Sequence, residues 1–313
     1  MNKMETTAST QIMSNPAVPA KKSTLFMKDF KALIKIGIVN SNLITTFVGF
    51  WLALYFTNAS ILDNWQLFLL TMFGSGFVIA GGAILNNWFD VDIDPVMSRT
   101  KSRPTVTGNI SMQTTLVLGI AASTFGHLIL LFTTVEATLF AFFGWFTYVV
   151  LYTMWSKRRY TLNTAVGSFS GAIPPLIGWA AVSPEIHIVP MVLFLIMFIW
   201  QTPHFLALAM KKCDDYKAAG IPMLPAVYGF EITKRQIVVY ITCLLPLPFF
   251  LASLGTTFLI IATILNIGWL ALGIAGFFVK NDLKWANLIF IYSLNYLTIL
   301  FLLMAVVTIN YPI

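Results

Sequence analysis

The chain has 313 residues, of which 58% are hydrophobic and 10% charged, and its formal net charge is +7. Soluble domains average about 45–50% apolar and about 25% charged residues, so this composition excludes a soluble globular protein. It indicates a protein that crosses a membrane several times, and its basic residues then set topology rather than bind nucleic acid. The two cysteines, Cys213 and Cys243, form no C-x-x-C pair, which argues against a disulfide framework or covalent haem attachment.

Residues 1–27 are polar, rich in Ser, Thr, Ala and Pro, and show no hydrophobic periodicity. We predict a disordered cytoplasmic tail over 1–27 and a single membrane domain over 28–313. The tail has no signal-peptide pattern, and it contains Glu5 but no Arg, which argues against a mitochondrial transit peptide. A bacterial plasma membrane is therefore favoured over a mitochondrial inner membrane.

A membrane-spanning helix needs about 20 apolar residues. Stretches without Asp, Glu, Lys or Arg that meet this length are 36–62, 64–89, 104–135, 137–156, 160–184, 186–210, 236–279 and 285–313. The seventh stretch would be about 66 Å long as a single helix, or two bilayer cores. It is predicted to form two helices that turn near Leu254 and Gly255, so the fold class is an all-α membrane protein with nine transmembrane helices.

The distribution of basic residues supports this count. Nine helices place successive connections on alternating sides of the membrane, and all 19 Lys and Arg residues fall on the N-terminal side: in 1–35, 88–110, 156–161, 211–235 and 280–284. Because basic residues accumulate in cytoplasmic connections, the N-terminus is predicted to be cytoplasmic. The opposite connections are very short, so we expect the active-site loops to be 88–110 and 211–235.

Three polar residues mark the end of the second predicted helix. Asn86, Asp90 and Asp94 are spaced i, i+4, i+8, so they share one helical face, and Asp92 points away. Pro95 disfavours helical geometry at Asp94, so the helix is predicted to end there. Carboxylates repel one another and the helix dipole at a C-terminus.

A divalent cation would remove this conflict. Oxygen ligands from one or two carboxylates, completed by substrate phosphates, are typical of Mg²⁺. We therefore predict a Mg²⁺ site on Asn86, Asp90 and Asp94. Three basic residues follow closely and suit a phosphate clamp: Arg99, Lys101 and Arg103.

A second charged cluster follows the sixth predicted helix, with Lys211 and Lys212 before Asp214 and Asp215. We expect it to add phosphate contacts and a further metal contact, for which Asp215 is the candidate. Lys35, at the start of the first helix, is either an interfacial anchor or another phosphate contact.

Two histidines lie inside predicted membrane helices, where ionisable residues are usually functional. His204 follows Pro203 and precedes Lys211 by about 10.5 Å of helix. It is a candidate for binding a substrate inside the bundle, and His127 is a second one. A hydrogen bond to a neighbouring helix is the alternative for both.

These motifs together resemble the UbiA superfamily of intramembrane prenyltransferases, and within it the protohaem IX farnesyltransferase (haem O synthase) family. The resemblance runs from about residue 30 to the C-terminus. It rests on N-x-x-x-D-x-x-x-D at 86–94 and on the segments 152–158, 171–179 and 200–225. The last segment joins the histidine to D-D-Y-x-x-A-G-I-P-M-L-P. Unlike the wider superfamily, this chain has adjacent aspartates at 214 and 215 instead of Asp-x-x-x-Asp, and no Pro-Arg after Lys35.

The resemblance implies transfer of a farnesyl group from farnesyl diphosphate to a vinyl group of haem B, with addition of water, giving haem O for haem-copper oxidases. It implies catalysis by Asn86, Asp90, Asp94, Asp214 and Asp215 with Mg²⁺. The implied diphosphate contacts are Arg99, Lys101, Arg103, Lys211, Lys212 and Lys35, and the implied haem contacts are His204 and His127. Haem B is then a substrate, the lipid bilayer surrounds the protein, and a haem A synthase is a downstream partner.

Three alternatives remain open at this point. A related enzyme could prenylate an aromatic quinone precursor, and a haem chaperone could bind haem without a Mg²⁺ site. A transporter is the third, although transporters place their charged sites near the membrane midplane, and here the acids cluster at one mouth.

Overall fold

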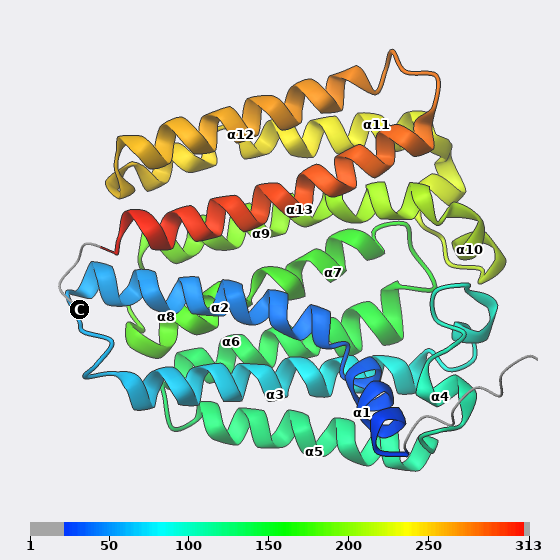
Figure 1. Cartoon of the computed structure of the whole chain (residues 1–313), viewed down its shortest axis with the longest axis horizontal. Helices are drawn as coiled ribbons and strands as arrows, with labels where there is room; N and C mark the ends of the chain where they lie inside the picture. The colour runs from blue at the N-terminus through cyan, green and yellow to red at the C-terminus, as the bar shows by residue number, and fades with distance from the viewer. Residues whose placement is uncertain (1–21, 310–313) are drawn as a thin grey trace, which may run out of the picture.

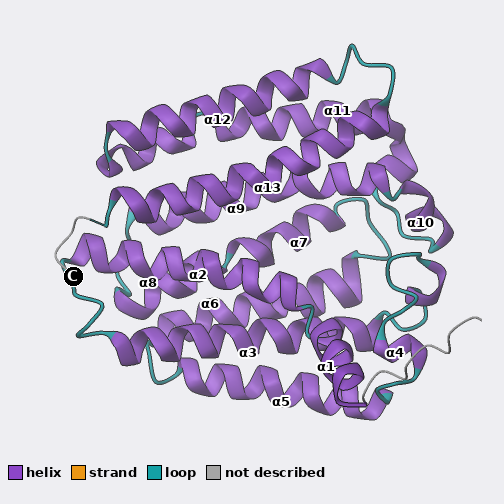
Figure 2. Cartoon of the chain, viewed as in Figure 1, coloured by secondary structure: helices purple, strands orange, loops and turns teal. Residues whose placement is uncertain are grey.

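The computed structural model describes residues 22–309, and every regular element in this part of the chain is a helix (Figure 2). Within it, nine segments are long and apolar enough to span a membrane, as predicted. They are α2 (Ile36–Thr57), α3 (Trp65–Phe89), α5 (Met112–Leu130), α6 (Val135–Phe146) with the π-helical η2 (Thr147–Ser156), α7 (Asn163–Ala172) with α8 (Pro174–Val182), α9 (Ile188–Lys211), α11 (Leu224–Leu244) with η3 (Leu247–Leu254), α12 (Thr256–Ala275) and α13 (Asp282–Val307).

The long helices lie side by side, and the short elements between them gather at one end of the bundle (Figure 1). These short elements are α1 (Lys22–Leu33), η1 (Asp94–Val96), α4 (Pro104–Thr107) and α10 (Cys213–Ala218). The two predicted active-site loops therefore meet at the same end, where the predicted topology places the cytoplasm.

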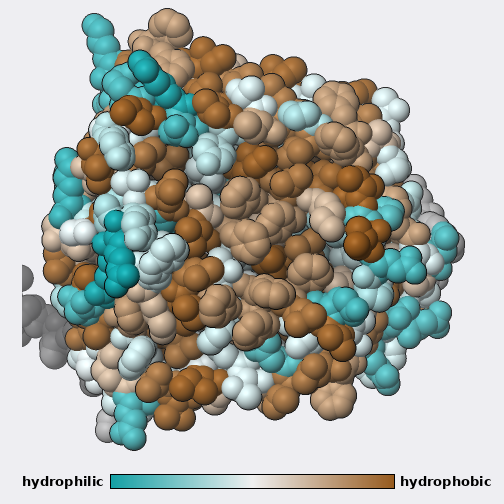
Figure 3. Space-filling view, turned by 180° about the vertical axis from the view of Figure 1, so that it is seen from behind, coloured by the Kyte–Doolittle hydropathy of each residue, from teal (hydrophilic) through white to brown (hydrophobic). Residues whose placement is uncertain are grey.

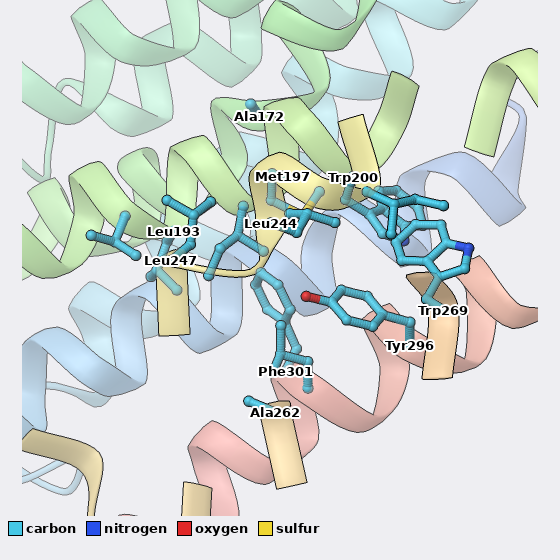
Figure 4. Packing of buried hydrophobic residues seen from close by; sticks show 14 of the residues in the cluster. Ala172, Leu193, Met197, Trp200, Leu244, Leu247, Ala262, Trp269, Tyr296 and Phe301 are labelled. Carbon is cyan, nitrogen blue, oxygen red and sulfur yellow. The ribbon is translucent and has the colours of Figure 1, made fainter. Parts of the chain in front are cut away.

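Helix α9 has a central position, since it packs against α7, α8, α11 and α13. Its apolar side chains belong to the largest buried cluster of the described residues, together with side chains from α11, α12 and α13 (Figure 4). Labelled members of this cluster include Leu193, Met197, Trp200, Leu244, Trp269, Tyr296 and Phe301. This packing fixes α9 and α13 against each other.

The outer surface is as apolar as a membrane requires. Large hydrophobic side chains cover the middle of the face seen in Figure 3, and hydrophilic ones gather toward its two ends. Phe73, Phe125 and Ile264 are all more than half exposed. Soluble monomers rarely expose apolar patches of this extent, so this band faces lipid in a multi-pass membrane protein.

Proline and glycine mark two breaks, of which the turn at Gly255 was predicted. Pro174 separates α7 from α8, and Gly255 precedes α12 with φ = 97°, a conformation that favours glycine. Helix α9, by contrast, continues through Pro203.

Two boundaries differ from the prediction. Residues 22–27, assigned to the tail, belong to α1, because Phe26, Phe30 and Leu33 form an apolar stripe at helical spacing and Leu33 is fully buried. Residues 1–21 of the predicted tail, and 310–313, lie outside the described residues. Helix α3 ends at Phe89 rather than at Asp94.

Close packing of α2 on α8 depends on Gly178, and it yields a first prediction. A Cβ atom at this position would lie 1.9 Å from the carbonyl oxygen of Thr46 and 2.7 Å from the backbone nitrogen of Phe50. Gly178→Ala should therefore destabilise the fold by about 1–3 kcal/mol, as overpacking does. The measurement is the apparent melting temperature in detergent. Gly37→Ala is the control, because nothing lies within 4 Å of its Cβ position; equal melting of both variants would contradict the packing argument.

The predicted topology gives a second prediction. In a variant with the exposed Cys243 replaced by Ser, cysteines introduced at the exposed positions 109 and 217 should react with an impermeant thiol reagent only from the cytoplasmic side. Glu185→Cys should react only from outside. The measurement is labelling of intact cells against inverted vesicles. Labelling of all three positions from one side would overturn the predicted arrangement.

Candidate active site

The end of α3 places two aspartates inside the protein. Asp90 follows the last residue of α3 and Asp94 begins η1, and both are fully buried. The backbone nitrogen of Asp94 donates to the carbonyl oxygen of Asp90 at 2.9 Å. The chain thus keeps one helix-like turn between the two carboxylates although the regular helix has ended. Asp92 is exposed, and its side chain points away as predicted.

Basic side chains from three other parts of the chain contact this segment. Arg103 forms an ion pair with Oδ2 of Asp94 at 2.5 Å, and Lys157 donates to Oδ2 of Asp90. Lys35 donates to Oδ1 of Asn86. The amide group of Asn86 in turn donates to Oδ2 of Asp90 at 2.9 Å. The acidic segment is therefore neutralised by residues that precede α2, precede α4 and follow η2.

One oxygen of each aspartate is left over. Oδ1 of Asp90 and Oδ1 of Asp94 are buried and accept no hydrogen bond in the described part of the chain. Arg158 forms a longer ion pair with Oδ1 of Asp90, at 3.6 Å. Buried carboxylate oxygens without partners are costly, and a hard cation would satisfy both.

The residues present fit Mg²⁺ bound jointly with a substrate. Among residues 22–309, no group of three or more His, Cys, Asp or Glu side chains could hold a metal by itself. Two carboxylates with free oxygens are a partial ligand set, which substrate phosphates and water complete in many Mg²⁺ sites.

The site carries more basic than acidic groups. Lys35, Arg99, Arg103 and Lys157 all line one cavity beside the two aspartates. Burial, and then the nearby Arg103 cation, lower the pKa of Lys35 well below its usual value; burial also lowers the pKa of Lys157. Burial and mutual repulsion disfavour the charged forms of these groups. A bound anion would stabilise them, so the cluster is suited to bind one.

Backbone strain at Lys35 agrees with a role of this residue in binding an anion. Its φ of 52° and ψ of 57° lie in the left-handed region, which costs an L-residue other than glycine about 1–2 kcal/mol. Such strain commonly occurs at functional sites. Here it accompanies the break between α1 and α2, from which the ammonium group reaches Asn86.

The cavity extends from these charges into the membrane domain. Its volume is about 440 Å³, and its inner walls are largely apolar, with Val78, Ile177 and Met197 among them. This is the usual size and character of a small-molecule site. Ile38, on α2, and Leu294, on α13, line it and are about half exposed, so we infer that the cavity opens sideways between these two membrane-spanning helices.

The structure brings part of the predicted site together at this cavity. The predicted residues that line it are Lys35, Asn86, Arg99, Arg103 and His204, with Asp90 and Asp94 beside them. Lys101, Lys212 and Asp214 do not line it.

Two other predicted residues, Lys211 and His127, form hydrogen bonds away from the cavity. Lys211 donates to Oδ1 of Asn287 at 2.6 Å, on α13, and not to the diphosphate region. His127 lies outside the cavity, with Nδ1 2.7 Å from the carbonyl oxygen of Ser123 on its own helix. Both were assigned from their position along a helix, which does not say which neighbour the side chain faces.

Asp215 connects the two loops without entering the cavity. Its carboxylate accepts a hydrogen bond from the hydroxyl of Ser98 at 2.7 Å, which lowers the pKa of Asp215. The next residue, Tyr216, lines the cavity instead, and burial raises its pKa. The predicted metal contact of Asp215 is therefore replaced by a contact between loops.

The prediction missed Lys157 and Arg158, which follow η2. Lys157 contacts Asp90, and Arg158 holds the exposed Asp92 with two hydrogen bonds of 2.7 Å, which lower the pKa of Asp92. The sequence could not distinguish a binding role for them, because basic residues that follow an apolar stretch also occur simply as cytoplasmic residues at the end of a membrane helix. The π-helical geometry of η2, which is frequent at functional sites, is not visible in the sequence.

Known proteins match this chain over most of its length. Residues 42–309 match the UbiA prenyltransferase family. A protein of Oceanobacillus iheyensis named "Protoheme IX farnesyltransferase" is 65% identical over 309 residues, which cover 98% of this chain and 98% of that protein. A protein of Bacillus subtilis named "Protoheme IX farnesyltransferase 2" is 59% identical over 302 residues, covering 96% and 99%.

Solved structures share the fold. One, described as "Structural and mechanistic insights into the biosynthesis of Digeranylgeranylglyceryl phosphate synthase in membranes", has a TM-score of 0.72 at 22% identity and covers 91% of this chain and 99% of that chain. A UbiA homolog from Archaeoglobus fulgidus bound to GPP and Mg2+ has a TM-score of 0.60 at 15% identity, covering 88% and 99%. The sequence match over residues 42–309 and these full-length relatives lead to one conclusion: the chain belongs to the UbiA prenyltransferase family.

Proposed function

We propose that this protein transfers the farnesyl group of farnesyl diphosphate to a vinyl group of haem B, with addition of water, and so produces haem O and diphosphate. The observation that carries the proposal is a pair of buried aspartate oxygens that accept no hydrogen bond and lie among basic side chains, at the mouth of an apolar cavity. The relatives named protoheme IX farnesyltransferase support haem as the acceptor.

The reaction needs no nucleophile from the protein. The bond between C1 of the farnesyl chain and its diphosphate oxygen breaks, and the diphosphate leaves with the electron pair. The vinyl group attacks the allylic cation to form a carbon–carbon bond, which leaves a cation beside the porphyrin ring. Water adds to that cation and loses a proton, giving the hydroxyethylfarnesyl group.

The basic side chains at the mouth stabilise the departing diphosphate. Lys35, Arg99, Arg103 and Lys157 are already in place before substrate binds, so little reorganisation is needed when charge develops. Mg²⁺ held by Asp90 and Asp94 would supply further charge stabilisation for the leaving group. In the same fold, the Archaeoglobus fulgidus homolog is described as bound to GPP and Mg2+.

The inner cavity suits the two apolar partners of the reaction. Tyr148 and Tyr152 line the wall, where aromatic faces can stabilise an allylic cation. Trp200 and His204 line it too, and there we place haem B. The sideways opening admits both substrates from the membrane, and the bacterial relatives favour the bacterial plasma membrane as its location. A haem A synthase remains the expected recipient of the product.

Removing the charge of either buried aspartate should abolish this activity. We expect Asp90→Asn or Asp94→Asn to lower kcat by at least about 10²-fold, because each removes a metal ligand and leaves a basic partner unpaired. The measurement is haem O formation by purified protein with haem B and farnesyl diphosphate. Asp92→Asn is the matched control. Asp92 is exposed, and its ion pair is with Arg158, outside the cavity. A dead Asp92→Asn beside an active Asp90→Asn would contradict the assignment.

Metal removal and product analysis test the reaction itself. Treatment with EDTA should stop haem O formation, and added Mg²⁺ should restore it. Two carboxylates are only a partial ligand set, so the chelator can remove the metal, and the leaving diphosphate then loses its charge stabilisation. Extraction and mass analysis of haem, after expression in a host that makes no haem O, identifies the product. Prenylation of an aromatic acid in place of haem B would favour a quinone-type enzyme, and haem binding without any prenyl transfer would favour a haem chaperone.

A further inference from the structure

His204 is held so that only one edge of its ring is accessible. The imidazole stacks on Trp200 with ring centroids 4.8 Å apart and on Phe290 with centroids 4.7 Å apart, at interplanar angles of 20° and 26°. The residue is 8% exposed, and it lines the cavity. Because aromatic rings cover the imidazole, a ligand in the cavity can approach it only along its edge.

One nitrogen on that edge is already bonded. Nδ1 of His204 lies 2.7 Å from Oγ of Ser293, on α13. The same hydroxyl donates to the carbonyl oxygen of Phe290 at 2.6 Å. A serine hydroxyl has a single hydrogen and a carbonyl oxygen can only accept, so towards His204 the hydroxyl accepts and Nδ1 carries the proton.

The other nitrogen is therefore an acceptor. In a neutral imidazole protonated at Nδ1, Nε2 presents a lone pair. The hydrogen bond recorded for the His204 ring among the described residues is the one at Nδ1, and Nε2 has none. No carboxylate is among the described contacts of His204, and the ammonium of Lys211 lies 4.5 Å from the centre of the same Phe290 ring. A positive charge on the imidazole, close to that of Lys211, is thus disfavoured. A haem propionate would need a donor here, whereas a metal needs a lone pair.

We propose that Ser293 is a positioning residue that fixes the tautomer of His204, so that Nε2 coordinates the iron of the haem substrate. This inference rests on the proposed function. A hydrogen bond on the second nitrogen of a ligating histidine sets which nitrogen binds metal and how the ring is oriented. Trp200 reinforces the arrangement, because its indole N–H donates to the carbonyl oxygen of Ser293 at 2.8 Å and holds α9 in register with α13.

Axial coordination would also orient the substrate. A porphyrin lies perpendicular to its axial iron–nitrogen bond, so a fixed imidazole leaves the haem free to turn only about that bond. The charged mouth then fixes the diphosphate, and His204 fixes the plane of the acceptor. The two substrates are then positioned by different side chains of one cavity.

The test uses the full-length protein in detergent with haem B and no diphosphate. Wild type should show a Soret band typical of histidine ligation, and the ferrous complex should show an iron–imidazole stretching band in its resonance Raman spectrum. His204→Gly should lose both, and added imidazole should restore them. Ser293→Ala should lower that stretching frequency and weaken haem binding by about 10–100-fold, the usual effect of removing such a support. Ser293→Thr, which keeps the hydroxyl, should restore both.

Asn295→Ala is the matched control, because Asn295 is exposed on the same turn of α13 and bonds only to its own helix. A His204→Gly or His204→Gln protein with the wild-type spectrum would overturn the inference, as would a Ser293→Ala protein identical to Asn295→Ala. In either case continued formation of haem O would leave the proposed function intact. A wild-type protein that neither binds haem B nor makes haem O would refute both.

Discussion

Two wholly buried carboxylates at the end of one membrane helix set the requirements for the rest of this structure. A buried charge must be paired, and here the partners come from outside the helix: Arg103, in the loop that follows, for Asp94, and Lys157, at the end of η2, for Asp90. Replacing buried ion pairs by apolar residues is often neutral or stabilising, so such pairs are poor evidence of a role in stability. Their retention agrees with a role in binding a charged ligand.

The pairs also explain how the site can exist before a ligand binds. Each carboxylate gives one oxygen to a cation at hydrogen-bond distance and keeps the other without a hydrogen bond, although Arg158 lies 3.6 Å from that oxygen of Asp90. The acidic segment therefore stays buried with one oxygen of each carboxylate still able to bind a metal. The cations in turn keep donors available for an anion. The packing of α3 against α2 and η2 brings these groups together.

Much of this could be predicted from the sequence where a feature depends on local order. Charge-free stretches predicted the nine membrane helices, Gly255 predicted the turn before α12, and the spacing of Asn86, Asp90 and Asp94 placed them at one mouth. Features that depend on tertiary contact could not be predicted. Lys157 reaches Asp90 from another helix, and Lys211 turns toward Asn287, although both appear in the sequence as lysines after an apolar stretch.

The two errors at element ends have different causes. The prediction ended α3 at Asp94 from a proline rule, but the turn after Phe89 preserved the i to i+4 backbone hydrogen bond between Asp94 and Asp90, so the common face survived the wrong boundary. Helix α1 was missed because its apolar stripe is short and interrupted by lysines.

Because the cavity opens sideways between α2 and α13, the substrate concentration that governs binding is the concentration in the membrane. Molecules that enter from a bilayer are confined to a thin sheet, and their availability depends on surface density, that is, on moles per mole of lipid. Half-saturation measured in micelles should then scale with the amount of detergent present, because added detergent dilutes an apolar substrate without changing its bulk molarity. The same opening lets a product that has gained an apolar chain diffuse laterally into the bilayer, with no passage through water.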